Sequence, residues 1–354
     1  QVAGRSQIGA GAVTIAMITS SSAGMPRQVF PIDPASYVRH AIHASDRAWA
    51  ETNCYVDVWV ELLHAWGFEP IAALPFTLAI DFEGDQWTFF KFPLVDLGEL
   101  FQLDVQELAI WRPLTSHLAE QIELGRPVLV ELDSYYLPDT VGTAYRMEHV
   151  KSTVAAVQID VDNRRLGYFH GQGYYHLEGE DFTQVLRATE SPDPASLPPY
   201  VEFVKRRSSP APRGAALLET SLRLLRRQME WLPESNPFPR FKRRFDIDLT
   251  WLAQESLDTF HKYSFATLRQ FGACYELAAT YLQWLHDQQA ADLRSPIADL
   301  LQLSAGAKTM QFTLARAMTR KKPLDLAPFD AMAERWQNAI DCLRTTFASP
   351  AASV

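Results

Sequence analysis

Cys54 is the residue of this sequence whose type and position best suit covalent chemistry. The apolar residues after it recur at helical spacing up to Gly67, and Thr52 or Asn53 supplies an N-cap, so the pattern predicts a helix over residues 54–66. Amide N–H groups and the dipole at a helix N-terminus stabilise a thiolate, and the same amides can hold the oxyanion of a tetrahedral intermediate. Cys54 is therefore the candidate nucleophile, although a single cysteine before an apolar helix is more often a small buried residue.

Cysteine catalysis also needs an imidazole that accepts and donates the proton. His149 opens a predicted strand over residues 149–160. A cysteine on a helix, then a strand, then a histidine at the start of a hairpin is the papain-like order. The residue that would orient His149 is open: we favour His170 on the returning strand, with Asp133 and Asp160 as the acidic alternatives.

The elements that must position these residues form two unlike halves. The patterns predict helices over residues 54–66, 94–103 and 113–124, and strands over residues 127–133, 149–160, 166–170 and 201–205. Beyond them, helices are predicted at about 215–231, 252–286, 297–320 and 328–347. We therefore expect an α+β fold, in which a papain-like domain with an antiparallel sheet precedes an all-α helical bundle.

Proline-rich breaks at residues 191–199 and 208–214 indicate the boundary between the halves. The predicted divisions are a loose tail at 1–25, the papain-like domain at 26–207, a linker at 208–213, the helical domain at 214–348 and a tail at 349–354.

Composition narrows the class of protein. The 3 cysteines are widely spaced and lack paired metal-ligand spacing, which argues against a disulfide scaffold and a zinc site. No apolar run approaches the roughly 20 residues of a membrane span. We expect a soluble cytoplasmic protein with no bound cofactor or metal and no membrane partner.

The net charge of -9 conceals a basic stretch at residues 205–244, where eleven Lys or Arg face three Glu. Such a stretch is usually a solvated helix face, but it can also dock an acidic partner. The docking candidates are Arg227, Arg240, Lys242, Arg243 and Arg244. Because no RNA-binding motif accompanies them, we expect no nucleic-acid partner.

Polar residues near aromatic segments are the candidates for substrate binding. The acidic run at 81–85 precedes an aromatic stretch; it reads either as a turn leading into a strand or as a site for a substrate ammonium. The polar residues of the aromatic segment 260–276 either face a cleft between the domains or satisfy one another. The candidates are Asn53, Asp81, Glu83, Asp85, Asp139, Arg269 and Glu276.

Several segments in fixed order resemble a bacterial family, domain of unknown function 1839. They are Asn53-Cys54-Tyr55-Val56-Asp57-Val58-Trp59, residues 81–91, Leu137-Pro138-Asp139-Thr140, Tyr168-Phe169-His170 and residues 260–276. The resemblance spans residues 30–347. That family is similar to the N-terminal domain of the butirosin-biosynthesis acyltransferase, a papain-like protein that moves an aminoacyl group from a carrier-protein thioester to an amine. The similarity lies in Cys54, residues 128–138, and His149 with residues 154–160.

The resemblance implies an aminoacyltransferase. The Cys54 thiolate would attack the thioester on the phosphopantetheine of an acyl or aminoacyl carrier protein, and His149 would deprotonate a small-molecule amine acceptor. Carrier proteins are acidic, which suits the basic stretch at 205–244. Two alternatives stay open: a cysteine hydrolase (thioesterase, amidase or peptidase) with the same dyad, and a non-catalytic carrier-binding scaffold.

Overall fold

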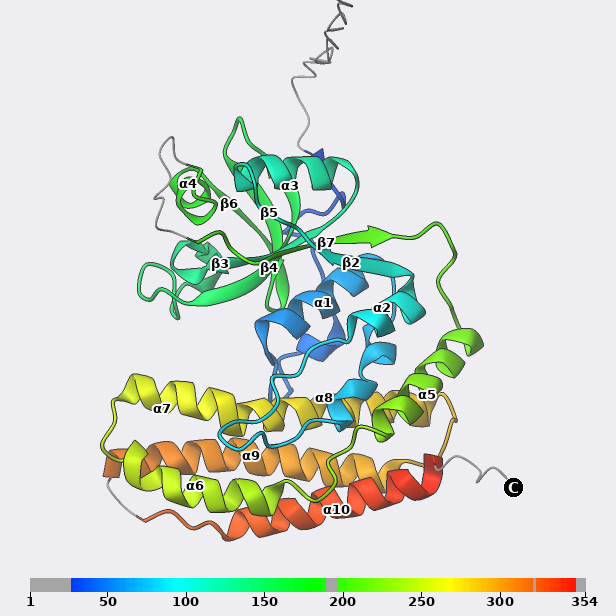
Figure 1. The fold of residues 1–354 in the computed structure, drawn as a ribbon, viewed down its shortest axis with the longest axis vertical. Helices are drawn as coiled ribbons and strands as arrows, with labels where there is room; N and C mark the ends of the chain where they lie inside the picture. The colour runs from blue at the N-terminus through cyan, green and yellow to red at the C-terminus, as the bar shows by residue number, and fades with distance from the viewer. Residues whose placement is uncertain (1–26, 189–196, 321–322, 348–354) are drawn as a thin grey trace, which may run out of the picture.

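The computed structural model describes residues 27–188, 197–320 and 323–347 (Figure 1). Both predicted tails, residues 1–25 and 349–354, and part of the predicted connection at 191–199 lie outside these ranges.

An antiparallel sheet forms the centre of the N-terminal half. Its strands in the described residues are β1 (Arg27–Gln28), β2 (Leu103–Glu107), β3 (Val128–Asp133), β4 (Lys151–Asp160), β5 (Arg165–His170), β6 (Gly173–Glu178) and β7 (Val201–Arg206). They are ordered β2-β7-β3-β4-β5-β6, with β1 paired to β4 outside this path. Strand β4 is buried on both faces, which explains its nearly continuous apolar run.

Helices cover both faces of this sheet (Figure 1). Helices α1 (Cys54–Ala65) and α2 (Leu94–Phe101) lie on one face, and α3 (Leu114–Glu123) and α4 (Glu180–Val185) lie on the other. Successive residues of a strand point to opposite faces. Accordingly, Ala155 of β4 belongs to the core under α1, whereas Val154 belongs to the core under α3.

The C-terminal half consists of helices in the described residues. They are α5 (Ala215–Met229), α6 (Phe238–Leu252), α7 (Leu257–Ser264), a π-helical turn (Phe265–Arg269), α8 (Gln270–Asp287), α9 (Arg294–Arg320) and α10 (Ala327–Phe347). Helix α8 packs on α9, α9 on α10 and α10 on α6. The predicted α+β class, an antiparallel sheet followed by a helical region, is confirmed.

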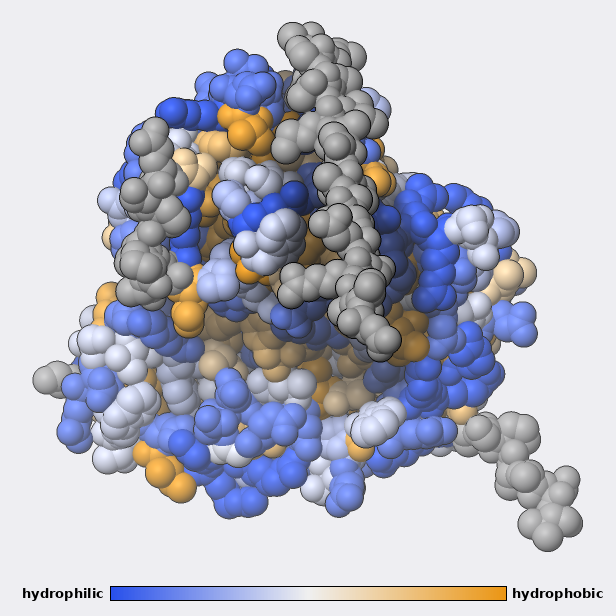
Figure 2. All heavy atoms as spheres, turned by 45° about the horizontal axis from the view of Figure 1, so that its top comes forward, coloured by the Kyte–Doolittle hydropathy of each residue, from blue (hydrophilic) through white to orange (hydrophobic). Residues whose placement is uncertain are grey.

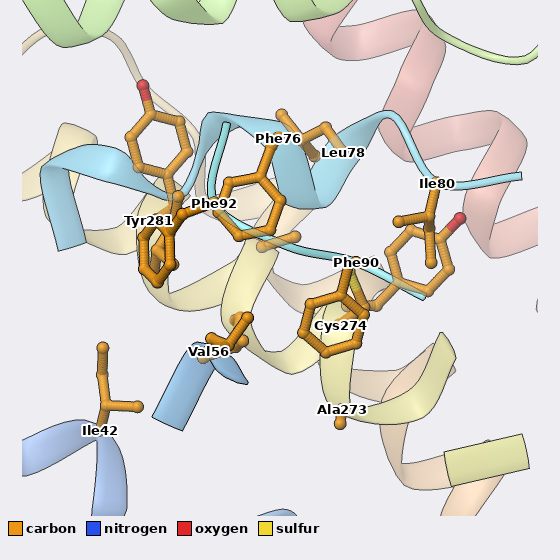
Figure 3. Packing of buried hydrophobic residues seen from close by; sticks show 14 of the residues in the cluster. Ile42, Val56, Phe76, Leu78, Ile80, Phe90, Phe92, Ala273, Cys274 and Tyr281 are labelled. Atoms are coloured by element: carbon orange, nitrogen blue, oxygen red, sulfur yellow. The ribbon is translucent and has the colours of Figure 1, made fainter. Parts of the chain in front are cut away.

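The two halves share one hydrophobic core. Figure 3 shows Val56 of α1 and Phe76 and Phe90 of the intervening segment in one cluster with Cys274 and Tyr281 of α8. All but Phe76 are at most 2 % exposed. Burial raises the pKa of the Cys274 thiol well above its usual value. Helix α8 is therefore a core element of the whole chain and not only of the helical half.

Several elements differ from the sequence prediction, and strand β6 and helix α4 were not predicted at all. Helix α6 was not predicted because its many Lys and Arg residues obscure the helical spacing of Phe238, Phe241 and Phe245, which are all fully buried. The single helix predicted over 252–286 begins five residues later than predicted, and the π-helical turn interrupts it. In that turn the Ala266 carbonyl accepts a 3.2 Å hydrogen bond from the Trp87 amide. Strand β2 was not predicted; it begins at residue 103, the last residue of the helix predicted over 94–103.

The face of the molecule in Figure 2 is mostly polar, with small separated hydrophobic spots. No helix in the described ranges has the length and apolar character that crossing a bilayer requires.

Candidate functional site

The Cys54 thiol lies at the first residue of α1. Asn53 caps this helix: its side-chain oxygen accepts a 3.0 Å hydrogen bond from the Val56 amide, and its amide nitrogen donates to the Phe90 carbonyl at 3.0 Å. Asn53 is only 3 % exposed. Its polar atoms therefore hold the helix start in place, and they are not free for the substrate-binding role that the sequence suggested.

The nearest polar partner of the thiol is a hydroxyl. Cys54 Sγ donates to Thr153 Oγ1 of β4 at 3.7 Å. Cys54 is partly exposed, as is Cys342, whereas Cys274 is buried. The thiol is thus accessible, but the group beside it is a threonine where a catalytic dyad would have an imidazole.

A small hollow adjoins Thr153 on the same face of the sheet. In it, Glu202 accepts hydrogen bonds from Tyr55 at 3.0 Å and from Tyr200 at 2.9 Å, and Lys91 Nζ lies 4.6 Å from the Tyr55 ring centroid. Burial, reinforced by the Glu202 carboxylate, raises the pKa of Tyr55, so its phenol remains a donor at neutral pH. The hollow therefore places a cation and fixed hydrogen-bonding groups next to the start of α1.

His149 contacts Asp133, one of the two acidic alternatives to His170 as the orienting residue. Its Nδ1 lies 2.6 Å from Asp133 Oδ2, and its ring stacks on Tyr135 with centroids 4.3 Å apart. The imidazole side chain is 65 % exposed. Of the alternatives for an orienting residue, Asp133 is therefore the one in contact with His149.

His149 and Cys54 face the same side of the sheet without touching. Glu131 and Thr153 are paired across β3 and β4, and Asp133 is two residues beyond Glu131, so Asp133 points to the face that carries Cys54. His149 precedes Thr153 by four residues, or about 13 Å of extended chain. The structure thus gives the thiol and the imidazole separate partners.

His170 lies on the opposite face. Its Nε2 is 2.6 Å from Ser152 Oγ and its Nδ1 is 2.5 Å from Asp139 Oδ2, while Tyr168 donates to Asp139 Oδ1 at 2.5 Å. Both ring nitrogens are occupied, which corrects the expectation that His170 orients His149. Asp139, expected to bind substrate, instead links the Leu137–Thr140 and Tyr168–His170 motifs. The other alternative, Asp160, accepts hydrogen bonds from Asn163 in the β4–β5 turn.

A buried imidazole–carboxylate cluster beneath α1 was missed by the sequence reasoning. His43 Nδ1 contacts Glu61, and its Nε2 lies 3.4 Å from Asp57 Oδ1. All three residues are at most 2 % exposed. Burial alone lowers the pKa of His43, but the hydrogen bonds and charges of the two carboxylates outweigh it and raise the pKa to about 9. His43 is therefore a buried cation at neutral pH.

This cluster attaches the preceding segment to α1. The Asp57 carboxylate accepts the Thr52 amide at 2.9 Å and the Thr52 hydroxyl at 2.6 Å, and Glu61 accepts the His40 amide at 3.1 Å. The signal in the sequence was two acidic residues four apart, Asp57 and Glu61, on an otherwise apolar helix. Buried carboxylates of this kind require a partner, and the nearby histidines are the obvious candidates.

The acidic run at 81–85 faces α6. Asp81 pairs with Arg240, Arg244 donates to the Gly84 carbonyl at 3.1 Å, and Glu83 accepts from Thr88 at 2.6 Å. The bridge between Phe82 and Trp87 closes a turn, as in the simpler of the two predictions. Asp81 and Glu83 are therefore occupied within the fold, while Asp85 sits in the same turn, near the Arg244 charge. This placement does not fit the expectation of an ammonium site.

Most of the proposed docking cations are also paired. Their partners are Asp96 and Glu99 for Arg227, Asp81 for Arg240, Asp330 for Lys242 and Asp248 for Arg244. Arg243 is exposed and has no ion-pair partner in the part of the chain that the structure describes. The basic stretch thus serves mainly to tie α5 and α6 to neighbouring elements.

Arg269 and Glu276 both face the N-terminal half. The Glu276 carboxylate accepts the amides of Ala48 at 3.0 Å and Trp49 at 2.9 Å, and Arg269 donates to the Glu51 carbonyl at 3.1 Å. These contacts bring the segment just before Cys54 against the helical half. Within the described ranges, no group of three His, Cys, Asp or Glu side chains is placed to hold a metal ion.

Comparison with known proteins identifies the family. A family model of the DUF1839 N-terminal domain matches residues 38–206, and a model of the DUF1839 C-terminal domain matches residues 214–345. No curated protein matches the chain. The chain belongs to the DUF1839 family, which confirms the resemblance seen in the sequence.

Proposed function

We propose that this member of the DUF1839 family is a papain-like acyltransferase that moves an aminoacyl group from a carrier protein to an amine through Cys54. The observation that carries the proposal is a partly exposed thiol at the first residue of α1, on the sheet face that also carries the exposed His149–Asp133 pair. The similarity of residues 128–138 and 154–160 to the butirosin acyltransferase supports the papain-like assignment and the donor class.

The chemistry comprises two displacements. The Cys54 sulfur attacks the carbonyl of the phosphopantetheine thioester, which forms an acyl-Cys54 thioester and releases the carrier thiol with a proton. The acceptor amine then attacks acyl-Cys54, His149 takes a proton from the amine, and the Cys54 thiol is regenerated. The amides at the start of α1 stabilise the oxyanion in both steps.

The dyad must tighten for this chemistry. His149 is bonded to Asp133 and stacked on Tyr135, and the thiol is bonded to Thr153. Catalytic hydrogen bonds in unliganded enzymes are often long and shorten in the substrate complex. The proposal therefore requires the segment before β4 to move toward α1 when the carrier arm is bound.

The carrier protein remains the proposed donor, but electrostatic attraction should contribute less to its binding than the sequence suggested. Four of the five docking cations have internal partners, so Arg243 is the one among these five without an ion-pair partner in the described residues. A partly exposed ion pair contributes little to attraction at physiological salt.

A non-catalytic carrier-binding scaffold is the second candidate, and the threonine beside the thiol favours it. The scaffold has an ordinary thiol at Cys54 and forms no acyl-enzyme. Iodoacetamide labelling followed by peptide mass spectrometry separates the candidates, with partly exposed Cys342 and buried Cys274 as controls in the same chain. An acyltransferase should label at Cys54 well below the ordinary thiol pKa of about 8.5, and faster than at Cys342.

Incubation with an aminoacyl pantetheine thioester completes the test. We expect an acyl adduct on Cys54 that an added amine removes, with about 100-fold slower transfer in His149→Ala and normal transfer in His261→Ala, an exposed histidine on α7. Release of the acyl group to water alone would indicate the hydrolase. Labelling of Cys54 no faster than Cys342, with no adduct, would exclude both enzymes.

A further inference from the structure

A hollow at the junction of the two halves carries three cations. It is lined by Arg47, Trp49, Glu51, Gln172, Arg269 and Lys308, together with the backbone between them. Its volume is about 360 Å³. This is the range of sites that hold small molecules, and it exceeds what a single ion needs.

The protein neutralises the cations of this hollow only in part. Glu276 forms an ion pair with Arg47 Nη2 at 3.7 Å but no hydrogen bond, because its oxygens accept the Ala48 and Trp49 amides. Glu51 is the other acidic neighbour, and one of its oxygens accepts from Gln172 at 2.9 Å. The three cations thus lie near two carboxylates that already accept other hydrogen bonds, and the exposed Asp46 adds a smaller negative charge near Arg47.

Two guanidinium groups beside this hollow also have buried nitrogens. Nε and Nη2 of Arg47 and Nε of Arg269 are buried without a hydrogen-bond partner in the described residues. A buried donor without an acceptor is costly, and more so when the group is charged. Burial also lowers the pKa of Arg47, and burial together with the Arg269 charge lowers the pKa of Lys308. These nitrogens do not open onto the hollow, but an anion bound there would stabilise the charges of the same guanidinium groups and of Lys308.

The wall that carries the cations is rigid. Trp49 donates from Nε1 to Ser304 at 3.0 Å, and Ser304 donates to the Gly272 carbonyl at 2.7 Å. A Cβ on Gly272 would lie 2.7 Å from the Trp49 ring, so this close packing requires glycine. Lys308 Nζ stands 4.1 Å from the Trp49 ring centroid. The cations are therefore held in place before any ligand arrives, which reduces the entropy lost on binding.

We infer that this hollow, which we call the junction pocket, binds the carboxylate or phosphate group of a small molecule. Arg47, Arg269 and Lys308 supply the charge, and guanidinium groups suit both planar carboxylates and phosphates. Glu51 marks the side of the pocket toward α1, three residues or about 10 Å of chain from Cys54. The inference concerns binding alone and does not rest on the proposed function.

Isothermal titration of the full chain with inorganic phosphate and with acetate, against chloride at equal ionic strength, tests the junction pocket. We expect saturable binding of at least one anion, weakened about tenfold or more by Lys308→Gln or Arg269→Gln. Arg226→Gln, which removes an exposed cation on α5, should leave it unchanged. The tighter of the two anions identifies phosphate or carboxylate as the recognised group.

Two results would overturn the inference: no saturable binding of either anion, or equal loss in Arg226→Gln and the pocket variants. Thermal unfolding of each variant shows whether it is folded, and Lys308→Gln is the safer variant because the lysine makes only its ring contacts in the described residues. Cys54→Ala should bind the anion normally even if it forms no acyl-enzyme, so failure of the acyltransferase proposal and failure of this one are distinguishable.

Discussion

Two imidazole–carboxylate assemblies in the N-terminal half have similar chemistry and opposite exposure. His43 is fully buried between Asp57 and Glu61, whereas the His149 side chain is 65 % exposed beside Asp133. A buried ion pair that loses one partner leaves an uncompensated charge, but an exposed pair exchanges its partner for water at little cost. Exposure therefore distinguishes a cluster that is part of the core from a pair that is open to solvent.

Replacement of His43 is expected to have the largest effect on stability. His43→Ala leaves two buried carboxylates unpaired and should lower the free energy of unfolding by about 3–5 kcal/mol. The matched change His149→Ala should cost at most about 0.5 kcal/mol because it lies on the surface. Urea unfolding of both variants measures the difference, and equal losses would remove the distinction between the two assemblies.

The second-largest expected effect is the change of the free energy of unfolding with pH. The folded pKa of His43, about 9, lies above its ordinary value of 6.5, so its contribution is complete below pH 6.5 and disappears as the pH rises through 9. The loss is at most about 3 kcal/mol. Burial, with the His64 charge, lowers the pKa of His40 to about 4, so stability should also fall as the pH drops from 6.5 toward 4.

Unfolding measured from pH 4 to pH 10 checks both limbs of this profile. In His43→Gln the loss of stability at alkaline pH should be absent, while the loss of stability at acid pH should remain. An alkaline loss of equal size in the variant would mean that another group is responsible.

The exposed pair should show the smallest effect on stability and a clear effect on activity. Asp133→Asn removes the charge beside His149 and should change the free energy of unfolding by less than about 1 kcal/mol. If the pair is the catalytic base, aminoacyl transfer should slow by about tenfold or more. Unchanged transfer, measured by mass spectrometry of acyl-Cys54, would mean that Asp133 does not support the reaction.

Local pattern was enough for the elements that carry the candidate site. The helix at Cys54, its Asn53 cap and the strand that follows His149 are short-range features, and the structure has each within two residues of the prediction. Helix α6 was not predicted because its charged residues obscure the helical spacing of its apolar residues. The π-helical turn was not predicted because it is a distortion imposed by packing, and the apolar pattern continues through it unchanged.

Amino-acid type and spacing alone thus determined the fold class and the position of the thiol at a helix start, and the resemblance of several motifs indicated the family. Only the tertiary structure decided which polar groups meet. It placed Thr153 beside Cys54, turned His170 to the other face of the sheet, paired Asp81 with Arg240 and gathered the cations of the junction pocket from both halves. Secondary structure follows from neighbours along the chain, whereas these pairings join residues between 18 and 261 positions apart, and long-range packing sets them.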